Sequence, residues 1–304
     1  MSRESAFIDS LRAIATHPAA RGLADDAAVL GDLVLTHDMI VEGVHFLPAD
    51  PPADIAWKLA AVNLSDLAAK GATPLGALIG YGLTGDAAWD AAFAAGLAAA
   101  LDQFGLPLLG GDTVSLPAGA PRTLGMTAIG RAPPGGAPAR SGARAGDGLF
   151  VTGTVGDAGL GLAMAQGRLE GPAALGDAYR RPVPLIAAGQ ALAAQVSAMM
   201  DVSDGLLIDA ARMADASGLA LRVDLDRVPL SPALVAVSGG GRAARIAAAT
   251  AGDDYQLLFA AAAPPAGLPC PVTRIGAFSA GRGLSLCDAG TPVSLPDRLG
   301  YLHD

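Results

Sequence analysis

The chain has 304 residues, of which 29 are acidic and 20 basic, giving a net charge of −9 at pH 7. At about 150 residues per domain, this length predicts two domains or one large one. Binding to DNA or RNA draws on a broad basic face that displaces counterions, so the acidic balance argues against a nucleic-acid partner. Because 52% of the residues are hydrophobic and only 16% are charged, we expect a buried core and no extensive disorder.

Features of membrane and secreted proteins are not evident in the sequence. The longest apolar stretch, residues 91–101, has 11 residues, whereas about 20 are needed to cross a bilayer. Glu4 and Asp9 interrupt the N-terminal segment, so no signal peptide is expected. The two cysteines, Cys270 and Cys287, make neither a disulfide framework nor a zinc site. We expect a cytoplasmic protein with free thiols and no membrane partner.

In the first half of the chain, apolar periodicity and Gly/Pro boundaries predict two helices and two strands. The helices are expected at residues 53–70 and 87–101, and the strands at residues 75–81 and 106–109. Residues 131–147, RAPPGGAPARSGARAGD, are the segment richest in Pro, Gly and Arg, which is typical of a linker. We therefore divide the chain into domains of residues 1–136 and 137–304.

The second half alternates strands and helices in the same way. Its expected elements are a strand at 148–152, helices from about 158 and at 186–196 and 206–217, and strands at 220–224 and 256–260. Such alternation indicates an α/β or mixed α+β arrangement in both halves.

The chain lacks the usual lysine-based phosphate sites. Its only lysines, Lys58 and Lys70, do not follow the glycines of a G-x-x-x-x-G-K-[ST] loop. The H-E-x-x-H and G-x-S-x-G motifs are absent as well. If the protein handles phosphate, another group has to neutralise its charge.

Acidic side chains stand beside small residues at the ends of the expected elements. They are Asp25, Asp26, Asp38, Asp66, Asp112, Asp201, Asp204, Asp253 and Asp254. Taken singly, most are explained as helix caps or turn residues. As a group with hardly any lysine, they predict Mg²⁺, which binds through a few carboxylates and substrate phosphates. Magnesium would supply the positive charge that lysine supplies in P-loop enzymes.

Asp66 differs from the others because it lies inside an apolar helix, with Asn63 three residues earlier on the same face. A carboxylate buried there has to be paired or metal-bound. Two interpretations are open, an intrahelical ion pair with Lys70 four residues later and a metal ligand.

Two glycine patterns are candidates for holding phosphate. Residues 151–162, VTGTVGDAGLGL, run from a strand into a helix, where the amides face an anion or simply form a turn. Residues 80–85, GYGLTG, match G-x-G-x-x-G between a strand and a helix, with Asp112 at the end of the next strand. This second pattern leaves a dinucleotide site as an alternative.

Seven segments occur in the order found in thiamine-monophosphate kinases: DLVLTHDMIVEGVHF, KLAAVNLSDLAAKGATP, LLGGDT, RSGARAGD, VTGTVGDAGLGL, DVSDGL and AGDDYQLLF. The chain resembles this family over residues 20–302. The family is part of an ATP-dependent superfamily that includes aminoimidazole ribonucleotide synthetase and selenophosphate synthetase. His45, the AGDDY segment and the terminal Gly300-Tyr301 favour the thiamine-phosphate branch.

The resemblance implies a mixed α/β fold of two domains. The N-terminal sheet domain would form a homodimer, and ATP with several Mg²⁺ ions would lie between it and a C-terminal α/β domain. The reaction would be direct transfer of the γ-phosphoryl group of ATP to thiamine monophosphate, giving thiamine diphosphate and ADP. Because such a transfer requires mainly positioning and charge neutralisation, no base or nucleophile is assigned.

The resemblance also assigns site residues by motif. The magnesium ligands would be Asp26, Thr36, Asp38, Asp66, Asp112, Asp201 and Asp204. Contacts to ATP would come from Gly111, Asp112, Arg140 and Ser203. Contacts to thiamine monophosphate would come from His45, Asp253 and Tyr301.

Four positions depart from the family pattern. Ala24 replaces a glycine in the turn before Asp25, and His37 stands where Thr or Ser is usual. Asp253 replaces a longer glutamate, and Gln256 replaces another acid. These changes leave the magnesium carboxylates in place and bear on the substrate contacts. Two alternatives therefore stay open, a related ATP-dependent synthetase with another acceptor and a non-catalytic nucleotide-binding protein.

Overall fold

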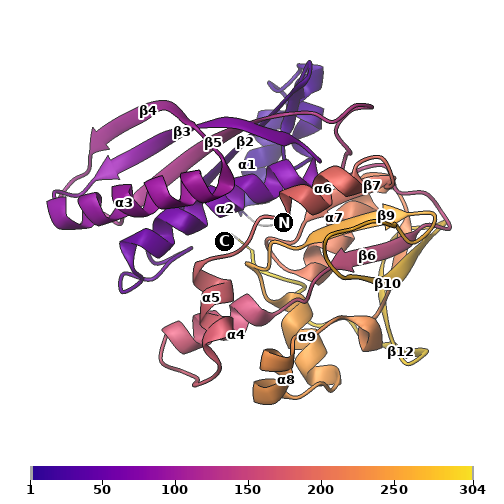
Figure 1. The fold of residues 1–304 in the computed structure, drawn as a ribbon. Coiled ribbons are helices and arrows are strands. Elements are labelled where there is room, and N and C mark those ends of the chain that lie inside the picture. The colour runs from indigo at the N-terminus through magenta and orange to yellow at the C-terminus, as the bar shows by residue number, and fades with distance from the viewer. Residues whose placement is uncertain (1–2, 303–304) are drawn as a thin grey trace.

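The structure of the chain, a computed structural model, describes residues 3–302 and contains one β-sheet in each half (Figure 1). The elements of the N-terminal half are α1 (Arg3–Arg12), η1 (Pro18–Leu23), β1 (Ala28–Leu30), β2 (Leu33–Val41), α2 (Pro52–Ala69), β3 (Thr73–Leu83), α3 (Ala87–Phe104), β4 (Leu108–Ser115) and β5 (Thr123–Arg131). Those of the C-terminal half are β6 (Gly148–Thr152), α4 (Asp157–Ala165), α5 (Ala173–Arg180), α6 (Ile186–Leu192), β7 (Ala198–Asp201), α7 (Leu206–Ser217), β8 (Ala220–Asp224), η2 (Leu225–Arg227), α8 (Pro232–Ser238), α9 (Arg242–Thr250), β9 (Leu257–Ala261), β10 (Val272–Ser279), β11 (Gly283–Asp288) and β12 (Thr291–Val293).

The first sheet has the strand order β1-β2-β5-β3-β4, in which β3 and β4 are parallel and the other neighbours antiparallel. Helices α2 and α3 cover one face of it (Figure 1). Helix α2 is apolar on nearly every side, so it is buried almost all round from Ile55 to Ala69. It contacts β2 and β5 on one side and α6 and β7 on the other. Helix α2 is therefore the element that joins the two halves.

The second sheet has the strand order β12-β11-β8-β10-β6-β9-β7. Its strands β6, β7 and β9 are buried along their whole length, which fits their nearly continuous apolar sequences. Two sheets with helices packed on them confirm the predicted mixed α/β class.

Several predicted elements are confirmed, and others have different ends: the helix expected at 186–196 stops at Leu192, and the one expected at 87–101 continues to Phe104. Helix α2 corresponds to the helix expected at 53–70, and β6 and α7 have the predicted bounds. The strand expected at 106–109 instead continues through GGDT, because β4 pairs in parallel with β3 as far as Ser115. The first sheet ends at Arg131 and the second begins at Gly148, while the domain division after residue 136 stays a prediction. No helix among residues 3–302 is long and apolar enough to cross a membrane.

Candidate active site

A pocket of about 640 Å³ lies between the two halves and is lined by residues from both. Eight of the residues assigned from the sequence are in its lining: Asp38, His45, Asp66, Asp201, Ser203, Asp204, Asp253 and Tyr301. The fold thus brings the predicted metal, ATP and acceptor residues of both halves to one cavity.

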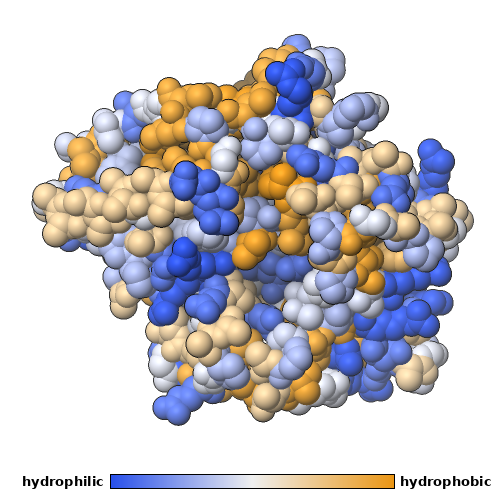
Figure 2. Space-filling model, in the orientation of Figure 1, coloured by the Kyte–Doolittle hydropathy of each residue, from blue (hydrophilic) through white to orange (hydrophobic). Residues whose placement is uncertain are grey.

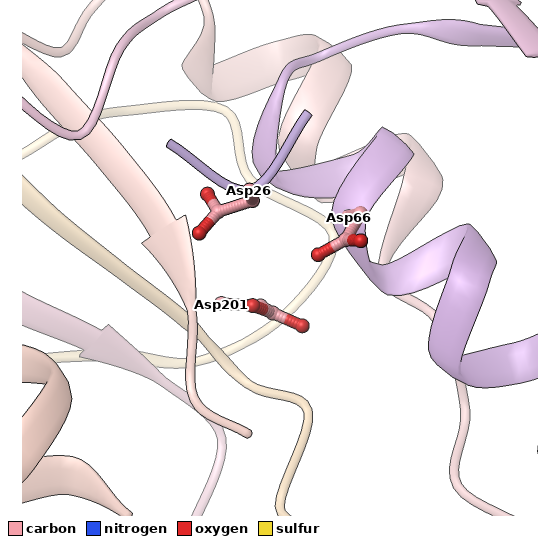
Figure 3. Close-up of side chains that lie close together, drawn as sticks. All are labelled: Asp26, Asp66 and Asp201. Atoms are coloured by element: carbon pink, nitrogen blue, oxygen red, sulfur yellow. The ribbon is translucent and has the colours of Figure 1, made fainter. Parts of the chain in front are cut away.

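Three carboxylates converge beside this pocket (Figure 3). Asp26 comes from the segment before β1, Asp66 from α2 and Asp201 from the end of β7. Each offers one oxygen, and these oxygens all lie within 4.8 Å of one another. The three residues are far apart in sequence, so only the packing of α2 between the sheets brings them together. We call Asp26, Asp66 and Asp201 the carboxylate triad.

The partner of Asp66 decides between its two interpretations. Its Oδ2 accepts a hydrogen bond from the Thr36 hydroxyl on β2, whereas Lys70 pairs with Asp25 and Asp26. Because side chains alternate along a strand, Thr36 and Asp38 point to the same face, toward α2. The intrahelical pair of Asp66 with Lys70 is therefore not the one that forms.

Polar residues of α2 fix the neighbouring carboxylates. Asn63 Oδ1 accepts a hydrogen bond from the backbone N–H of Asp38 at 3.0 Å. The Ser65 hydroxyl donates to Asp201 Oδ2 at 2.6 Å. Both side chains are fully buried, which means that each bond is made away from water and holds its strand against α2.

For two carboxylates of the triad, the surroundings disfavour the ionised form. Burial raises the pKa of Asp66 well above its usual value, and the charges of Asp38, Asp201 and Asp26 raise it further. Burial and the nearby charge of Asp26 do the same to the pKa of Asp201. Burial with the charges of Asp26 and Asp204 raises the pKa of Asp38 to about 6. Within residues 3–302, no lysine or arginine forms an ion pair with Asp38, Asp66 or Asp201.

Asp26 behaves in the opposite way. Burial alone would raise its pKa, but Lys70 and Arg140 outweigh that effect and lower it to about 2. Arg140 pairs with Asp26 Oδ1, and Lys70 Nζ lies 2.6 Å from Oδ2. Among the described residues, no hydrogen bond is aligned on that buried Oδ2. Lys70 therefore contacts Asp26 as an ion pair.

The donor set of this centre fits magnesium. It consists of buried carboxylate oxygens with a hydroxyl beside them, and hard oxygen ligands are those that Mg²⁺ takes in proteins. The raised pKa values show a deficit of positive charge at Asp66 and Asp201, and a cation between them would remove it. A divalent ion is thus compatible with the residues present.

The predicted acceptor residues lie around Asp253. Its carboxylate accepts a hydrogen bond from Lys58 at 2.8 Å and another from the Tyr255 hydroxyl at 2.9 Å. Asp253 has a left-handed backbone with φ of 67°, and its N–H donates to Ser203 O at 2.7 Å. The His45 backbone carbonyl accepts from the same lysine at 3.0 Å. Lys58 thus ties the two halves together at this end of the pocket.

Asp209, which was not predicted from the sequence, holds the loop DVSDG in place. Asp209 accepts hydrogen bonds from the backbone N–H groups of Ser203, Asp204 and Gly205 at 3.1 to 3.2 Å. Arg212 pairs with both Asp204 and Asp209, at 2.5 and 2.9 Å. The position of Asp209 in the first turn of α7 is the signal that would have identified it, since acids favour that turn.

Gly111 and Asp112 are not in the lining of this pocket. They lie on β4, and Asp112 lines a second pocket of about 210 Å³ together with His37. Because His37 and Asp38 are successive strand residues, their side chains point to opposite faces of the sheet. Asp112 is therefore on the face opposite α2.

The two glycine patterns also have a different environment from the one expected of phosphate loops. In the turn before α4, both oxygens of Asp254 accept a hydrogen bond from the Gly156 N–H, at 2.8 and 2.9 Å. This amide is therefore already bonded to a carboxylate of the protein and is not free to bind a phosphate. In GYGLTG, residues 80–83 belong to β3. They are extended and do not form the tight turn that a dinucleotide site requires.

The roles that were not predicted from the sequence are mostly those of basic residues. Lys58 and Lys70 are buried in or at the end of α2, and each pairs with carboxylates of the predicted set. Two lysines within an otherwise apolar helix are the signal that could have pointed to them, because a buried ammonium group requires partners.

Known proteins are similar to this chain in both of its halves. The N-terminal domain of AIR synthase related proteins matches residues 24–132, and their C-terminal domain matches residues 144–291. The thiamine-monophosphate kinase of Caulobacter vibrioides is 41% identical, covering 94% of this chain and 86% of the relative. That of Escherichia coli K12 is 39% identical, covering 93% and 91%.

Solved structures agree with the sequence relatives. The crystal structure of thiamine-monophosphate kinase from Stenotrophomonas maltophilia K279a has a TM-score of 0.77 at 37% identity, covering 94% of this chain and 95% of that one. AaThiL complexed with AMPPCP and TMP has a TM-score of 0.83 at 29% identity, covering 97% and 96%. The chain therefore belongs to the AIR synthase-related proteins and, within them, to the thiamine-monophosphate kinase family.

Proposed function

We propose that the chain is a thiamine-monophosphate kinase, which transfers the γ-phosphoryl group of ATP to thiamine monophosphate and forms thiamine diphosphate and ADP. The observation that carries the proposal is the meeting of carboxylates from both halves of the chain at one pocket. It is supported by family membership and by the related protein that was crystallised with AMPPCP and TMP.

The metal ions in this proposal would be held on the pocket side of α2. The ligands we assign there are Asp26, Thr36, Asp38, Asp66, Asp201 and Asp204. When bound, magnesium supplies the positive charge that neutralises the phosphates during transfer. Thr36 and Ser65 hold Asp66 and Asp201 by hydrogen bonds, so both carboxylates are oriented before any ligand arrives.

The acceptor is itself a phosphate, which explains why no general base is needed. A phosphate monoester is largely ionised at neutral pH, so its oxygen can attack without first losing a proton to the protein. The protein then has to position two anionic substrates. We assign Arg140 and Ser203 to ATP, and His45, Asp253 and Tyr301 to thiamine monophosphate.

One further residue belongs to the acceptor side in this proposal. Among the described residues that line the pocket, Arg298 is the only arginine or lysine. It lies three residues before Tyr301, and the Tyr301 backbone N–H donates to Asp204 O at 2.9 Å. Since guanidinium groups bind phosphate well, we expect Arg298→Gln to raise the KM for thiamine monophosphate, measured by ADP release at saturating ATP.

We also propose a homodimer formed through the open face of the first sheet, in which Gly111 and Asp112 take part in ATP binding. This face carries the exposed side chains of Met39, Leu78 and Val114. Figure 2 shows hydrophobic residues gathered over this sheet at the top of the view. A second copy would cover them and would bring its own chain next to Asp112. Light scattering should give twice the chain mass, and Val114→Lys should give a monomer.

A cytoplasmic location is part of the proposal. Cys270 and Cys287 are free thiols, which suits a reducing compartment.

The test of the function is ADP release from ATP and Mg²⁺ with and without thiamine monophosphate. We expect ADP only when the acceptor is present, with an equal amount of thiamine diphosphate. Release that requires a different acceptor would instead favour a related synthetase. Nucleotide binding without any turnover would favour a non-catalytic protein.

A further inference from the structure

Lys70 is a fully buried cation at the edge of the carboxylate triad. It caps the C-terminus of α2, and its side chain has no exposure to solvent. Its ammonium group meets three oxygens, those of Asp25 Oδ1, Asp26 Oδ2 and the Met199 carbonyl. Two of these contacts are hydrogen bonds, to Asp25 Oδ1 and the Met199 carbonyl, and the contact with Asp26 Oδ2 is an ion pair. Together they fix the position of the ammonium group.

The charge in this region is divided unevenly. Asp25 and Asp26 together face three cations, Arg21, Lys70 and Arg140. In contrast, none of Asp38, Asp66 and Asp201 forms an ion pair within residues 3–302. The triad therefore has one member that the protein pairs with cations itself and two that have no cationic partner among the described residues.

We propose that Lys70 is a built-in cation of the metal centre, which holds Asp26 in place and supplies positive charge that a divalent ion would otherwise supply there. The inference rests on the proposed metal centre. The ammonium lies 2.6 Å from Asp26 Oδ2, so its charge acts directly on that carboxylate. A divalent ion at the triad is then bound mainly by Asp66 and Asp201 and is repelled by Lys70.

The experiment is Mn²⁺ binding to the full chain without nucleotide, measured by electron paramagnetic resonance of the free ion. Lys70→Met removes the internal charge while keeping the length of the side chain. We expect it to bind Mn²⁺ at least about tenfold more tightly than the wild type. Equal or weaker binding by Lys70→Met, with binding by the wild type intact, would overturn the inference.

Lys58→Met is the matched control, because it also removes one buried lysine from α2. Lys58 stands eight residues before Asp66, about 12 Å along the helix, and pairs with Asp253. It should change the Mn²⁺ affinity less than Lys70→Met does. A gain as large as that of Lys70→Met would mean that net charge, and not the place of Lys70, sets the affinity.

A second pair of variants tests the idea if Lys70→Met does not fold. Asp26→Asn removes a carboxylate that is already neutralised, whereas Asp66→Asn removes one that is not. We expect Asp66→Asn to weaken Mn²⁺ binding about tenfold more than Asp26→Asn, and equal losses would contradict the role of Lys70. A wild type that binds no Mn²⁺ would instead refute the metal centre itself, so the two failures are distinguishable.

Discussion

At the scale of single residues, the site is defined by which carboxylates have a cation and which do not. Asp66 accepts one hydrogen bond from the Thr36 hydroxyl and has no cationic partner among the described residues, although it is only 8% exposed and surrounded by other acids. A structural carboxylate in such surroundings would normally be paired. The lack of a cationic partner among the described residues supports the proposed ligand role.

We expect Asp66→Asn to abolish turnover and to leave the fold intact. The amide keeps the shape and can still accept from Thr36, but it loses the charge that would hold a metal ion against the phosphates. Without metal, the melting temperature should stay the same or rise, because a buried uncompensated charge is removed. Measurements of kcat and of thermal unfolding test this, with exposed Asp102→Asn on α3 as the control. A normal kcat in Asp66→Asn would exclude the ligand role.

Asp253 is expected from the sequence to contact the acceptor, and in the structure its carboxylate is paired with Lys58. Because Lys58 is buried and paired with it, Asp253→Ala would strand an ammonium group and also cost stability. Asp253→Asn is the cleaner change. It should raise the KM for thiamine monophosphate roughly tenfold, with little change in the KM for ATP, because one charge-assisted hydrogen bond is weakened. Equal changes in both KM values would assign Asp253 a structural role only.

At the scale of elements, α2 is the common support of the site. It carries Asp66, Asn63 and Ser65 on its surface toward β2 and β7, and it also packs against α6. The contact with α6 is very close at Gly189, where an added Cβ would lie 2.0 Å from the carbonyl oxygen of Ala68. Only glycine allows the two helices to approach in this way.

We therefore expect Gly189→Ala to destabilise the chain, by about 1–3 kcal/mol, because the helices have to move apart. Gly176→Ala on α5 is the matched control, since nothing lies within 4 Å of its added Cβ. There, the higher helix propensity of alanine should stabilise by up to about 1 kcal/mol. Denaturant unfolding of both variants gives the comparison. Equal stabilities would show that α6 can shift without cost.

The same elements show what the sequence could predict. Helices α2 and α7 and strand β6 were predicted because their apolar patterns and Gly/Pro boundaries are local signals. The course of β4 was not, because its second half depends on pairing with β3. Lys70 was placed near Asp66 by helical spacing, yet its side chain reaches Asp25 and Asp26 in another segment. Side-chain partners across the fold are tertiary facts that spacing alone does not contain.

At the scale of the whole molecule, folding forces acidic groups from distant segments into one buried place. The free energy for holding them there comes from the packing of two sheets and the helices around them, and not from the groups themselves. The carboxylates are therefore a cost to stability when they are ionised and without a cation. A cation that binds only the folded state would lower that cost.

The cost of burying these carboxylates depends on pH. The pKa of Asp38 is raised to about 6 in the folded chain, and those of Asp66 and Asp201 are raised in the same direction. A group with a raised folded pKa favours folding below its unfolded pKa, and this contribution is lost as the pH rises through the folded pKa. The metal-free protein should therefore lose stability as the pH rises from about 4 through about 6, where Asp38 ionises, and Asp66 and Asp201 should add to this loss in the same direction. Asp26, with its pKa lowered to about 2, contributes in the opposite sense but only below about pH 4.

Magnesium would bind the ionised carboxylates, so its stabilising effect should grow over the same pH range. We expect Mg²⁺ to raise the melting temperature more at about pH 7.5 than at about pH 5, by about 2–4 °C for each 1 kcal/mol of added stability. Thermal unfolding in chelator and in Mg²⁺ at both pH values measures this, with a monovalent salt of equal ionic strength as the control. Asp66→Asn should remove most of the difference. A magnesium effect that is equal at the two pH values, or larger at the lower one, would show that the ion does not bind to these buried carboxylates.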